Sequence, residues 1–194
     1  MAPVTIRCGE SHRIFPNERA CLFLARSPRH GLTAPMVAVR AVAEGDWELM
    51  RDVRLAALRD VPDAFGSSYA REAVFTDEQW RGRINARSAT FFAYVTGIDE
   101  PAGLAGVYEE DGMADLVSMW VRPAARGRGV GEALISAAAD WARDRGHGAL
   151  YLWVTEANKP ARRLYERYGF TATGETQPLP SNPSLTEMRM RLPL

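Results

Sequence analysis

Apolar and polar positions along this chain change period several times from Met36 onward, and each period predicts one kind of element. Residues 36–42 alternate like a first strand. Apolar residues at helical spacing follow, and Asp46 stands where an N-cap is expected. A second helix is expected after Thr76, because Thr76 and Gln79 have the spacing of a capping box. The apolar positions of these two helices are Trp47, Met50, Val53, Ala57, Leu58, Val61, Trp80 and Ile84.

The rest of the chain continues as strands and helices in alternation. A helix is expected from residue 130, with apolar residues on one face, and another between Asn158, a possible N-cap, and Gly169, which suits a helix end. A turn is expected at residues 97–101. The order β-α-α-β-β-β-α-β-α-β-β predicts an α/β (α+β) fold with seven strands and four helices. The later strands are expected at residues 90–96, 104–109, 114–121, 149–154, 170–174 and 186–192.

The first 35 residues differ from the rest. They contain Pro3, Pro16, Pro28 and Pro35 and show no sustained period of 2 or 3.6. We expect residues 1–35 to be an N-terminal extension, disordered or upstream of the natural start. Residues 36–194 are expected to form one domain, because a chain of 194 residues suits a single domain with a sizeable core.

Composition excludes several classes of protein. The formal net charge is zero, which gives no sign of a nucleic-acid surface. No apolar run has the length of a membrane helix and no signal-peptide pattern opens the chain, so we expect a cytoplasmic protein away from membranes. Cys8 and Cys21 with three scattered histidines are poor evidence for a disulfide framework or a metal site, and no metal is expected.

A glycine-rich turn, Arg126-Gly-Arg-Gly-Val-Gly131, separates the expected strand 114–121 from the helix that follows. Such a turn leaves backbone N–H groups unpaired at the positive end of the helix dipole, which favours a phosphate or pyrophosphate. A nucleotide P-loop would need Gly-Lys-Ser/Thr here, but Lys159 is the only lysine of the chain. The dinucleotide fingerprint G-x-G-x-x-G also differs from the observed G-x-G-x-G.

Two motifs in this half of the chain carry a resemblance to a known family. Arg126, Gly129 and Gly131 match the pattern Arg/Gln-x-x-Gly-x-Gly/Ala. The second pattern is Asn-x-x-Ala-x-x-Leu-Tyr-x-x-x-Gly-Phe, which this chain matches at Asn158, Ala161, Leu164, Tyr165, Gly169 and Phe170. In this order and separation, the motifs resemble those of the GCN5-related N-acetyltransferases (GNAT). The resemblance covers residues 36–194, with specific motifs only in 115–170.

The resemblance implies a GNAT fold with a central, mixed, mostly antiparallel sheet, and acetyl-coenzyme A as cosubstrate. In that family the fourth and fifth strands splay apart, and main-chain groups of the fourth strand bind the pantetheine arm. Tyr165 matches the tyrosine that protonates the departing thiolate in many members, while on spacing alone it could also be a core aromatic. The cofactor-binding residues implied here are Met119, Trp120, Val121, Arg126, Gly127, Arg128, Gly129, Val130, Gly131, Asn158, Ala161 and Tyr165.

The general base and the acceptor are less defined. Asp115 stands where some members place a glutamate base, and strict alternation would put Asp115 on one face with Val117, Met119 and Val121. Glu109, Glu110, Glu156 or a bound water are alternatives. The family grips its acceptor with segments that correspond to residues 62–68, where Asp63 and Phe65 lie, and to residues 176–184.

The expected function is acetyl transfer to a primary amine of a small molecule or peptide, by direct attack in a ternary complex. The expected protein is a monomer or homodimer with no nucleic-acid partner. A coenzyme-A-binding sensor without catalysis, and an acyltransferase for a longer acyl group or a hydroxyl acceptor, remain alternatives.

Overall fold

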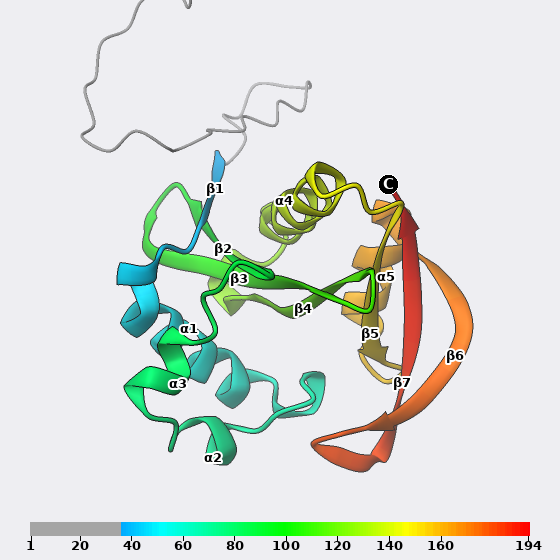
Figure 1. Cartoon of the computed structure of the whole chain (residues 1–194), viewed down its shortest axis with the longest axis horizontal. Helices are drawn as coiled ribbons and strands as arrows, with labels where there is room; N and C mark the ends of the chain where they lie inside the picture. Colours follow the sequence, from blue (N-terminus) through cyan, green and yellow to red (C-terminus); the bar gives the residue numbers. More distant parts are fainter. Residues whose placement is uncertain (1–35) are drawn as a thin grey trace, which may run out of the picture.

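The computed structural model describes residues 36–194, so the expected extension 1–35 lies outside the described residues. The described chain forms one seven-stranded sheet in the order β1-β2-β3-β4-β5-β7-β6 (Figure 1). Only β4 and β5 pair in parallel, and the other neighbours are antiparallel, which confirms the expected mixed sheet. The strands are β1 (Val37–Ala41), β2 (Ser88–Val95), β3 (Ile98–Glu110), β4 (Met113–Val121), β5 (Ala149–Thr155), β6 (Thr171–Leu179) and β7 (Asn182–Pro193).

Helices cover both faces of the sheet (Figure 1). On one face lie α1 (Trp47–Asp60), the single turn α2 (Tyr69–Glu72) and α3 (Asp77–Arg81), with a core around Trp80, Phe92 and Leu104. On the other lie α4 (Val130–Asp144) and α5 (Lys159–Tyr168), with a larger core that includes Leu134 and Leu152. The four expected helices are therefore present, and α2 is an addition. Short 3-10 turns complete the chain at Glu44–Asp46, Pro62–Ala64 and Pro123–Ala125.

Of the helix caps and the turn expected from local sequence, some are present and others differ. The capping box before α3 is confirmed, because Thr76 Oγ1 accepts from Gln79 N–H at 3.3 Å and Gln79 Oε1 accepts from Thr76 N–H at 2.8 Å. Asp46 precedes α1 but makes no capping bond to it, because its carboxylate accepts from Arg40 and from Ala43 N–H at the preceding 3-10 turn. The turn expected at 97–101 is shorter, since β3 already begins at Ile98 after Gly97 with φ +83°.

Within residues 36–194, no helix is both long and apolar enough to cross a membrane. The same part of the chain holds no group of three or more histidine, cysteine, aspartate or glutamate side chains arranged for a metal ion.

Candidate active site

Strands β4 and β5 pair over only a short stretch and then separate. Their register runs from Ala114 opposite Leu150 to Leu116 opposite Leu152 and ends there. Beyond that point β4 continues to Val121 beside β3, while β5 continues to Thr155 beside β7. The expected separation of the fourth and fifth strands is confirmed, and it leaves one edge of β4 without a strand partner.

A β-bulge at Ser118 changes which face each β4 side chain occupies. The residue has φ +55°, and the register shifts so that Gly106 faces Val117 while Leu104 faces Trp120. The extra residue reverses the alternation. Met119 and Val121 therefore pack into the α4 core and Trp120 into the α1 core. The expectation that Asp115 shares a face with Met119 and Val121 was wrong, because strict alternation does not anticipate a bulge.

The bulge also decides which main-chain groups of β4 face the gap. Arg122 N–H donates to Ala102 O of β3 at 2.8 Å. In an antiparallel pair, successive residues point their N–H and C=O groups to opposite sides. The backbone of Trp120 therefore faces β3, whereas the backbones of Met119 and Val121 face the open edge. Of the three β4 residues expected at the cofactor, Met119 has its main-chain groups at the open edge and Val121 has its N–H there, since Val121 O accepts from Arg126.

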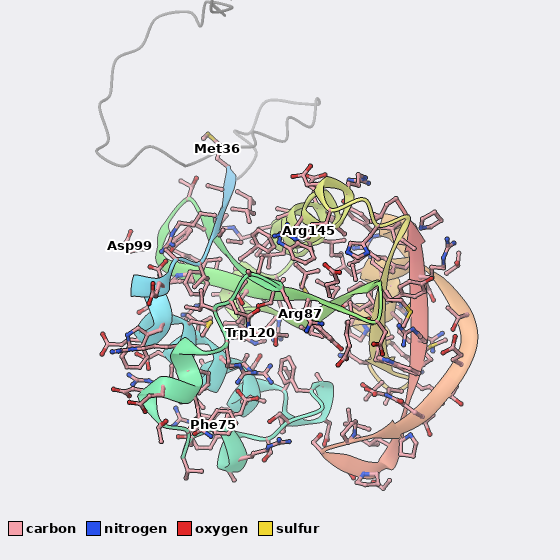
Figure 2. The ribbon with its side chains drawn as sticks, in the orientation of Figure 1. Met36, Phe75, Arg87, Asp99, Trp120 and Arg145 are labelled. Atoms are coloured by element: carbon pink, nitrogen blue, oxygen red, sulfur yellow. The ribbon has the colours of Figure 1, made fainter. Side chains whose placement is uncertain are left out.

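Trp120 fixes the end of β4 through its side chain. Its indole Nε1 donates to Asp60 Oδ2 at 2.9 Å, at the last residue of α1. Arg126 reaches the same carboxylate with Nη2, and its Nε donates to Val121 O at 3.0 Å. Trp120 lies between the sheet and the helices α1 and α3 (Figure 2). Asp60 thus ties α1 to β4 and to the start of the glycine turn.

The glycine turn presents a row of free backbone donors. Among residues 36–194, the N–H groups from Gly127 to Glu132 have no hydrogen-bond acceptor, and the first bond of the α4 start is Ala133 N–H to Gly129 O at 3.1 Å. Gly127 and Gly129 have φ +73° and +82°, a left-handed backbone that favours glycine. Unpaired N–H groups at a helix start form an anion seat, and the residues present fit a pyrophosphate.

The other residues of the turn have distinct surroundings. A Cβ on Gly129 would meet only Val37 Cγ2 at 4.0 Å, so the space beside it is open. A Cβ on Gly131 would lie 2.7 Å from Leu164 Cδ2, so Gly131 lets α4 approach α5. Val130 is buried and contributes only its backbone. Arg128 donates to Thr96 O at 2.6 Å, which holds the turn against the end of β2.

Helix α5 begins with the expected cap. Asn158 Oδ1 accepts from Ala161 N–H at 3.2 Å, and Gly169 closes the helix with φ +116°. The cap uses the carbonyl of the side chain, so the Asn158 NH₂ group stays available to a ligand. Ala161 lies half-buried in the first turn of α5. The cap and its neighbour therefore sit where β5 ends, beyond the stretch paired with β4.

Tyr165 lies inside the α4 core, 6% exposed, with its ring edge-on to Phe170 at 5.6 Å between centroids. Its hydroxyl makes no hydrogen bond among the described residues. Burial raises the pKa of the Tyr165 phenol well above its usual range, because the phenolate would lose its hydration. The phenol therefore keeps its proton at neutral pH. The ring of Tyr165 therefore packs in the core, and its hydroxyl is available to donate a hydrogen bond.

Asp115 is buried on the α1 face and pairs with Arg189 of β7. Arg189 Nη2 lies 3.2 Å from Oδ1 and 3.5 Å from Oδ2, and its guanidinium stacks on Tyr151 and Trp153. Burial raises the pKa of the Asp115 carboxyl, while Arg189 opposes the rise and Glu110 adds to it. The net pKa of Asp115 is above the ordinary value of an aspartate.

The other expected carboxylates lie elsewhere. Glu109 points toward the α4 side, where its carboxylate lies 3.6 Å from His147 Nε2. Glu110 and Glu156 are exposed at strand ends. A further carboxylate, Glu187 of β7, is 7% exposed and accepts from Gln177 Nε2 at 2.7 Å. Burial raises the pKa of Glu187, which makes it a second buried acid on the face that carries Arg189.

The two segments expected to grip the acceptor meet in the structure. Ser181 Oγ, at the tip of the β6–β7 hairpin, donates to Phe65 O at 2.5 Å, and Asn182 Nδ2 donates to Asp63 Oδ1 at 3.3 Å. Phe65 itself is buried beneath Arg54, whose guanidinium lies 4.5 Å from the ring centroid. Phe65 thus packs the loop, and Asp63 remains the exposed member of the pair.

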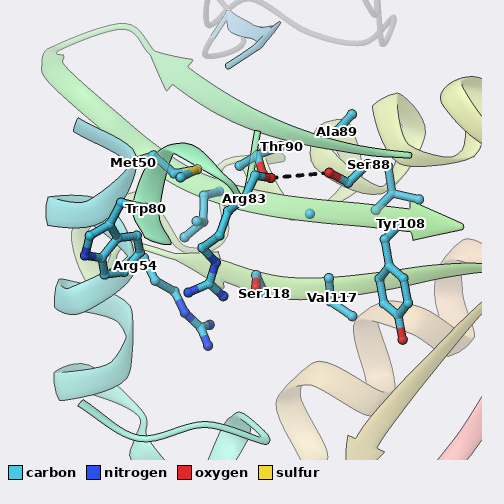
Figure 3. A pocket seen from close by; sticks show the side chains of 13 residues that line it. Met50, Arg54, Trp80, Arg83, Ser88, Ala89, Thr90, Tyr108, Val117 and Ser118 are labelled. Atoms are coloured by element: carbon cyan, nitrogen blue, oxygen red, sulfur yellow. Dashed lines mark hydrogen bonds between the residues drawn. The ribbon is translucent and has the colours of Figure 1, made fainter. Parts of the chain in front are cut away.

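A pocket of about 100 Å³ opens on the α1 face beside the β4 bulge (Figure 3). Val117 and Ser118 form part of its wall, so it adjoins the place where β4 leaves β5. The remaining lining residues are Met50, Arg54, Trp80, Arg83, Ser88, Ala89, Thr90, Leu104, Gly106, Val107 and Tyr108.

Sequence reasoning missed several charged residues near this face, although each left a signal. Arg54 lies on the apolar face of α1 between Met50 and Ala57. Charged Glu187 and Arg189 alternate with apolar residues in β7. A charge at an otherwise apolar position calls for a partner. The sequence alone does not show which partner that is.

Comparisons with known proteins agree with this geometry. The profile described as Acetyltransferase (GNAT) family matches residues 54–170, well over half of the chain. A solved structure described as a GCN5-related N-acetyltransferase from Kribbella flavida is similar with a TM-score of 0.65 and 27% identity, over 81% of this chain and 98% of that chain.

Two curated relatives are similar over shorter stretches. Streptothricin acetyltransferase of Streptomyces lavendulae is 50% identical over 54 residues, which are 28% of this chain and 29% of that protein. Mycothiol acetyltransferase of Rhodococcus erythropolis (strain PR4) is 30% identical over 156 residues, 73% of this chain and 52% of that protein. The chain thus spans about half or less of the length of these relatives.

Proposed function

Since this chain belongs to the acetyltransferase (GNAT) family, we propose that it transfers an acetyl group from acetyl-coenzyme A to a primary amine of a small molecule or peptide. The observation that carries the proposal is the open edge of β4 beside a row of free N–H groups at the start of α4. An extended arm with a pyrophosphate at one end fits this combination. Bound acetyl-coenzyme A supplies the thioester whose acetyl group is transferred.

Each group of the chain has a role in this proposal. The N–H groups from Gly127 to Gly131 bind the pyrophosphate, and the main chain of Met119 and Val121 orients the pantetheine arm. Asn158 donates its NH₂ group to the same arm. A rigid seat of this kind places the acetyl group for attack without further ordering.

Proton transfer needs two further groups. An ammonium must lose a proton before it can attack, and Asp115 accepts that proton at a carboxylate oxygen, directly or through a water. Arg189 holds this carboxylate in place. Tyr165 donates its hydroxyl proton to the departing sulfur. Glu187 is the competing base, because it is equally buried and also has a raised pKa.

The proposal is tested by incubating the protein with acetyl-coenzyme A and a panel of amines and measuring the release of free thiol. We expect thiol release that depends on the amine, with an N-acetylated product in the same amount. Coenzyme binding without release across a broad panel would favour a sensor without catalysis. Release with alcohols but not amines would favour a hydroxyl acceptor. The cytoplasmic location and the monomeric or homodimeric state expected from the sequence stay predictions.

A further inference from the structure

Three charged side chains form a group beside α1, of which Arg54 and Glu72 are buried and Arg83 is partly exposed. Arg54 donates from Nε to Glu72 Oε2 at 3.1 Å and from Nη2 to Oε1 at 2.8 Å, and Arg83 Nη1 donates to Oε2 at 2.7 Å. Arg54 is 6% exposed and Glu72 1%. Burial would raise the pKa of Glu72, but the two guanidinium groups hold it below its ordinary value. Glu72 is therefore ionised, and the group has two positive charges against one negative charge.

The two arginines have donors that Glu72 does not use. Arg54 Nη1 is buried and has no hydrogen-bond partner within residues 36–194. Arg83 bonds Glu72 through Nη1 alone, so its Nε and Nη2 stay free in the described part of the chain. A buried donor without a partner is costly, and a native structure rarely leaves one without a reason. The group therefore carries one positive charge more than its carboxylate balances, and it has free donors on both arginines.

Both arginines line the pocket beside the β4 bulge (Figure 3). Figure 3 shows their guanidinium groups toward the α1 side of the pocket, with Tyr108 at the other end. None of the lining residues is an aspartate or a glutamate. The surplus positive charge is thus unbalanced at the pocket wall. Met50, Trp80 and Leu104 make much of the remaining wall apolar.

The opposite end of the pocket, at Tyr108, lies near the carboxylates of Asp115 and Glu110, and Arg189 pairs with Asp115 there. Burial raises the pKa of Tyr108, the carboxylates of Asp115 and Glu110 raise it further, and Arg189 lowers it. Tyr108 also faces Asp115 across β3 and β4. A molecule with a carboxylate at one end and an ammonium at the other fits this arrangement. Its carboxylate would lie at the two arginines and its ammonium on the side of Asp115.

We propose that Arg54 and Arg83 bind a carboxylate of the acceptor, so that the acceptor is an amino acid or another small amine that carries a carboxylate. The planar fork of a guanidinium matches a carboxylate in two-point hydrogen bonding. The apolar wall contacts the carbon chain between the two charged ends. This inference rests on the proposed function and specifies the substrate class of the same site.

Matched pairs of acceptors test this inference. Each pair consists of an acid and the amide of the same acid, which is nearly equal in size. The pairs are leucine and leucinamide, methionine and methioninamide, and β-alanine and β-alaninamide, with spermidine as a cation without a carboxylate. Binding to the protein saturated with coenzyme A is measured by calorimetry, and turnover by thiol release. The comparison of acid and amide rests on binding rather than on turnover. The amino groups of amides are less basic, so more of the amide is unprotonated at neutral pH and it reacts more readily whatever its affinity. We expect the best acid to bind about 10-fold or more tighter than its amide, since a site built for an acid leaves its donors unpaired with the amide.

Arg83→Gln separates recognition from folding, because the Arg83 side chain is 36% exposed and the Arg54–Glu72 pair stays in place. The preference for the acid should fall to about 3-fold or less, with KM for the acid raised and kcat and coenzyme affinity within about 3-fold of wild type. Arg83→Lys should keep part of the preference, because it keeps the charge. The control is Arg81→Gln. Arg81 is an exposed arginine that stacks on Trp47, and its replacement should leave the preference for the acid unchanged.

Amides or spermidine bound as tightly as the acids, or an unchanged preference in Arg83→Gln, would overturn the inference. Its failure differs from that of the proposed function. Amines acetylated without any preference for acids leave the function standing and remove the inference. Acids that bind through Arg83 without any thiol release would keep the carboxylate site at Arg54 and Arg83 and remove the function, and with it the role of the acid as acceptor.

Discussion

Replacement of Gly129 by alanine isolates the anion seat, and the chain offers a matched control. Gly129 has φ +82° and Gly146 has φ +80°, and a Cβ meets nothing closer than 4.0 Å at the first and nothing within 4 Å at the second. The left-handed backbone costs alanine about 1–2 kcal/mol at either position. Both variants should therefore lose similar stability without ligand. Only Gly129 lies in the row of free N–H groups.

The ligand should separate the two variants. Acetyl-coenzyme A at a hundred times Kd stabilises the wild type by about 2.7 kcal/mol, and a tenfold loss of affinity lowers this to about 1.4 kcal/mol. For a chain of this length the shift in Tm falls from about 5–11 °C to about 3–6 °C. We expect the smaller shift in Gly129→Ala, the full shift in Gly146→Ala, and no shift in Gly129→Asp, which adds a negative charge. Thermal denaturation with and without ligand measures all three. Equal shifts in Gly129→Ala and Gly146→Ala would refute the seat.

Two further predictions concern the site, and a third concerns residues 1–35. Tyr165→Phe should lower kcat by about 10²–10³ with coenzyme affinity within a few-fold, as expected for a lost general acid. Because burial raises the pKa of Tyr165, its phenol stays protonated through the usual assay range, so the mutant should keep the alkaline limb of the pH profile; wild-type kcat would assign Tyr165 to packing alone. Asp115→Asn should flatten the acidic limb of the pH profile. It should lower kcat/KM most above the raised pKa of Asp115, where the wild-type carboxylate is ionised and can act as the base, and least at low pH, where that carboxyl is already protonated. An unchanged profile would transfer the role to Glu187 or water. A protein that starts at Met36 should fold and bind acetyl-coenzyme A like the full chain, as measured by calorimetry, and loss of binding would show that residues 1–35 contribute.

The predictable parts of the site are those that local sequence determines. The glycine turn 126–131 and the Asn158 cap depend on a few adjacent residues, and their geometry follows from helix ends and left-handed glycines. The bulge at Ser118 was not predictable, because one extra residue in a strand leaves little trace in an alternating pattern. It reversed the faces of Met119 and Val121.

The other contacts that the sequence did not predict join residues far apart along the chain. Arg189 and Asp115 meet across 74 positions of sequence, and Asp60 and Arg126 across 66. No local signal specifies such partners. Asp46 shows the same competition over a shorter range, because Arg40 and Ala43 N–H bond the carboxylate that was expected to cap α1. Patterns predicted which residues are buried better than they predicted which polar groups meet.

Hydrogen–deuterium exchange with and without acetyl-coenzyme A tests the central claim most directly, because it reports on the individual backbone donors assigned to the cosubstrate. We expect added protection at the amides of Gly127–Glu132 and at Met119 and Val121. Trp120 should change little, since its N–H already faces β3, and Gly146 should not change. Protection at the turn and at the open edge of β4 together would support the proposed seat. Protection confined to other parts of the chain would contradict it.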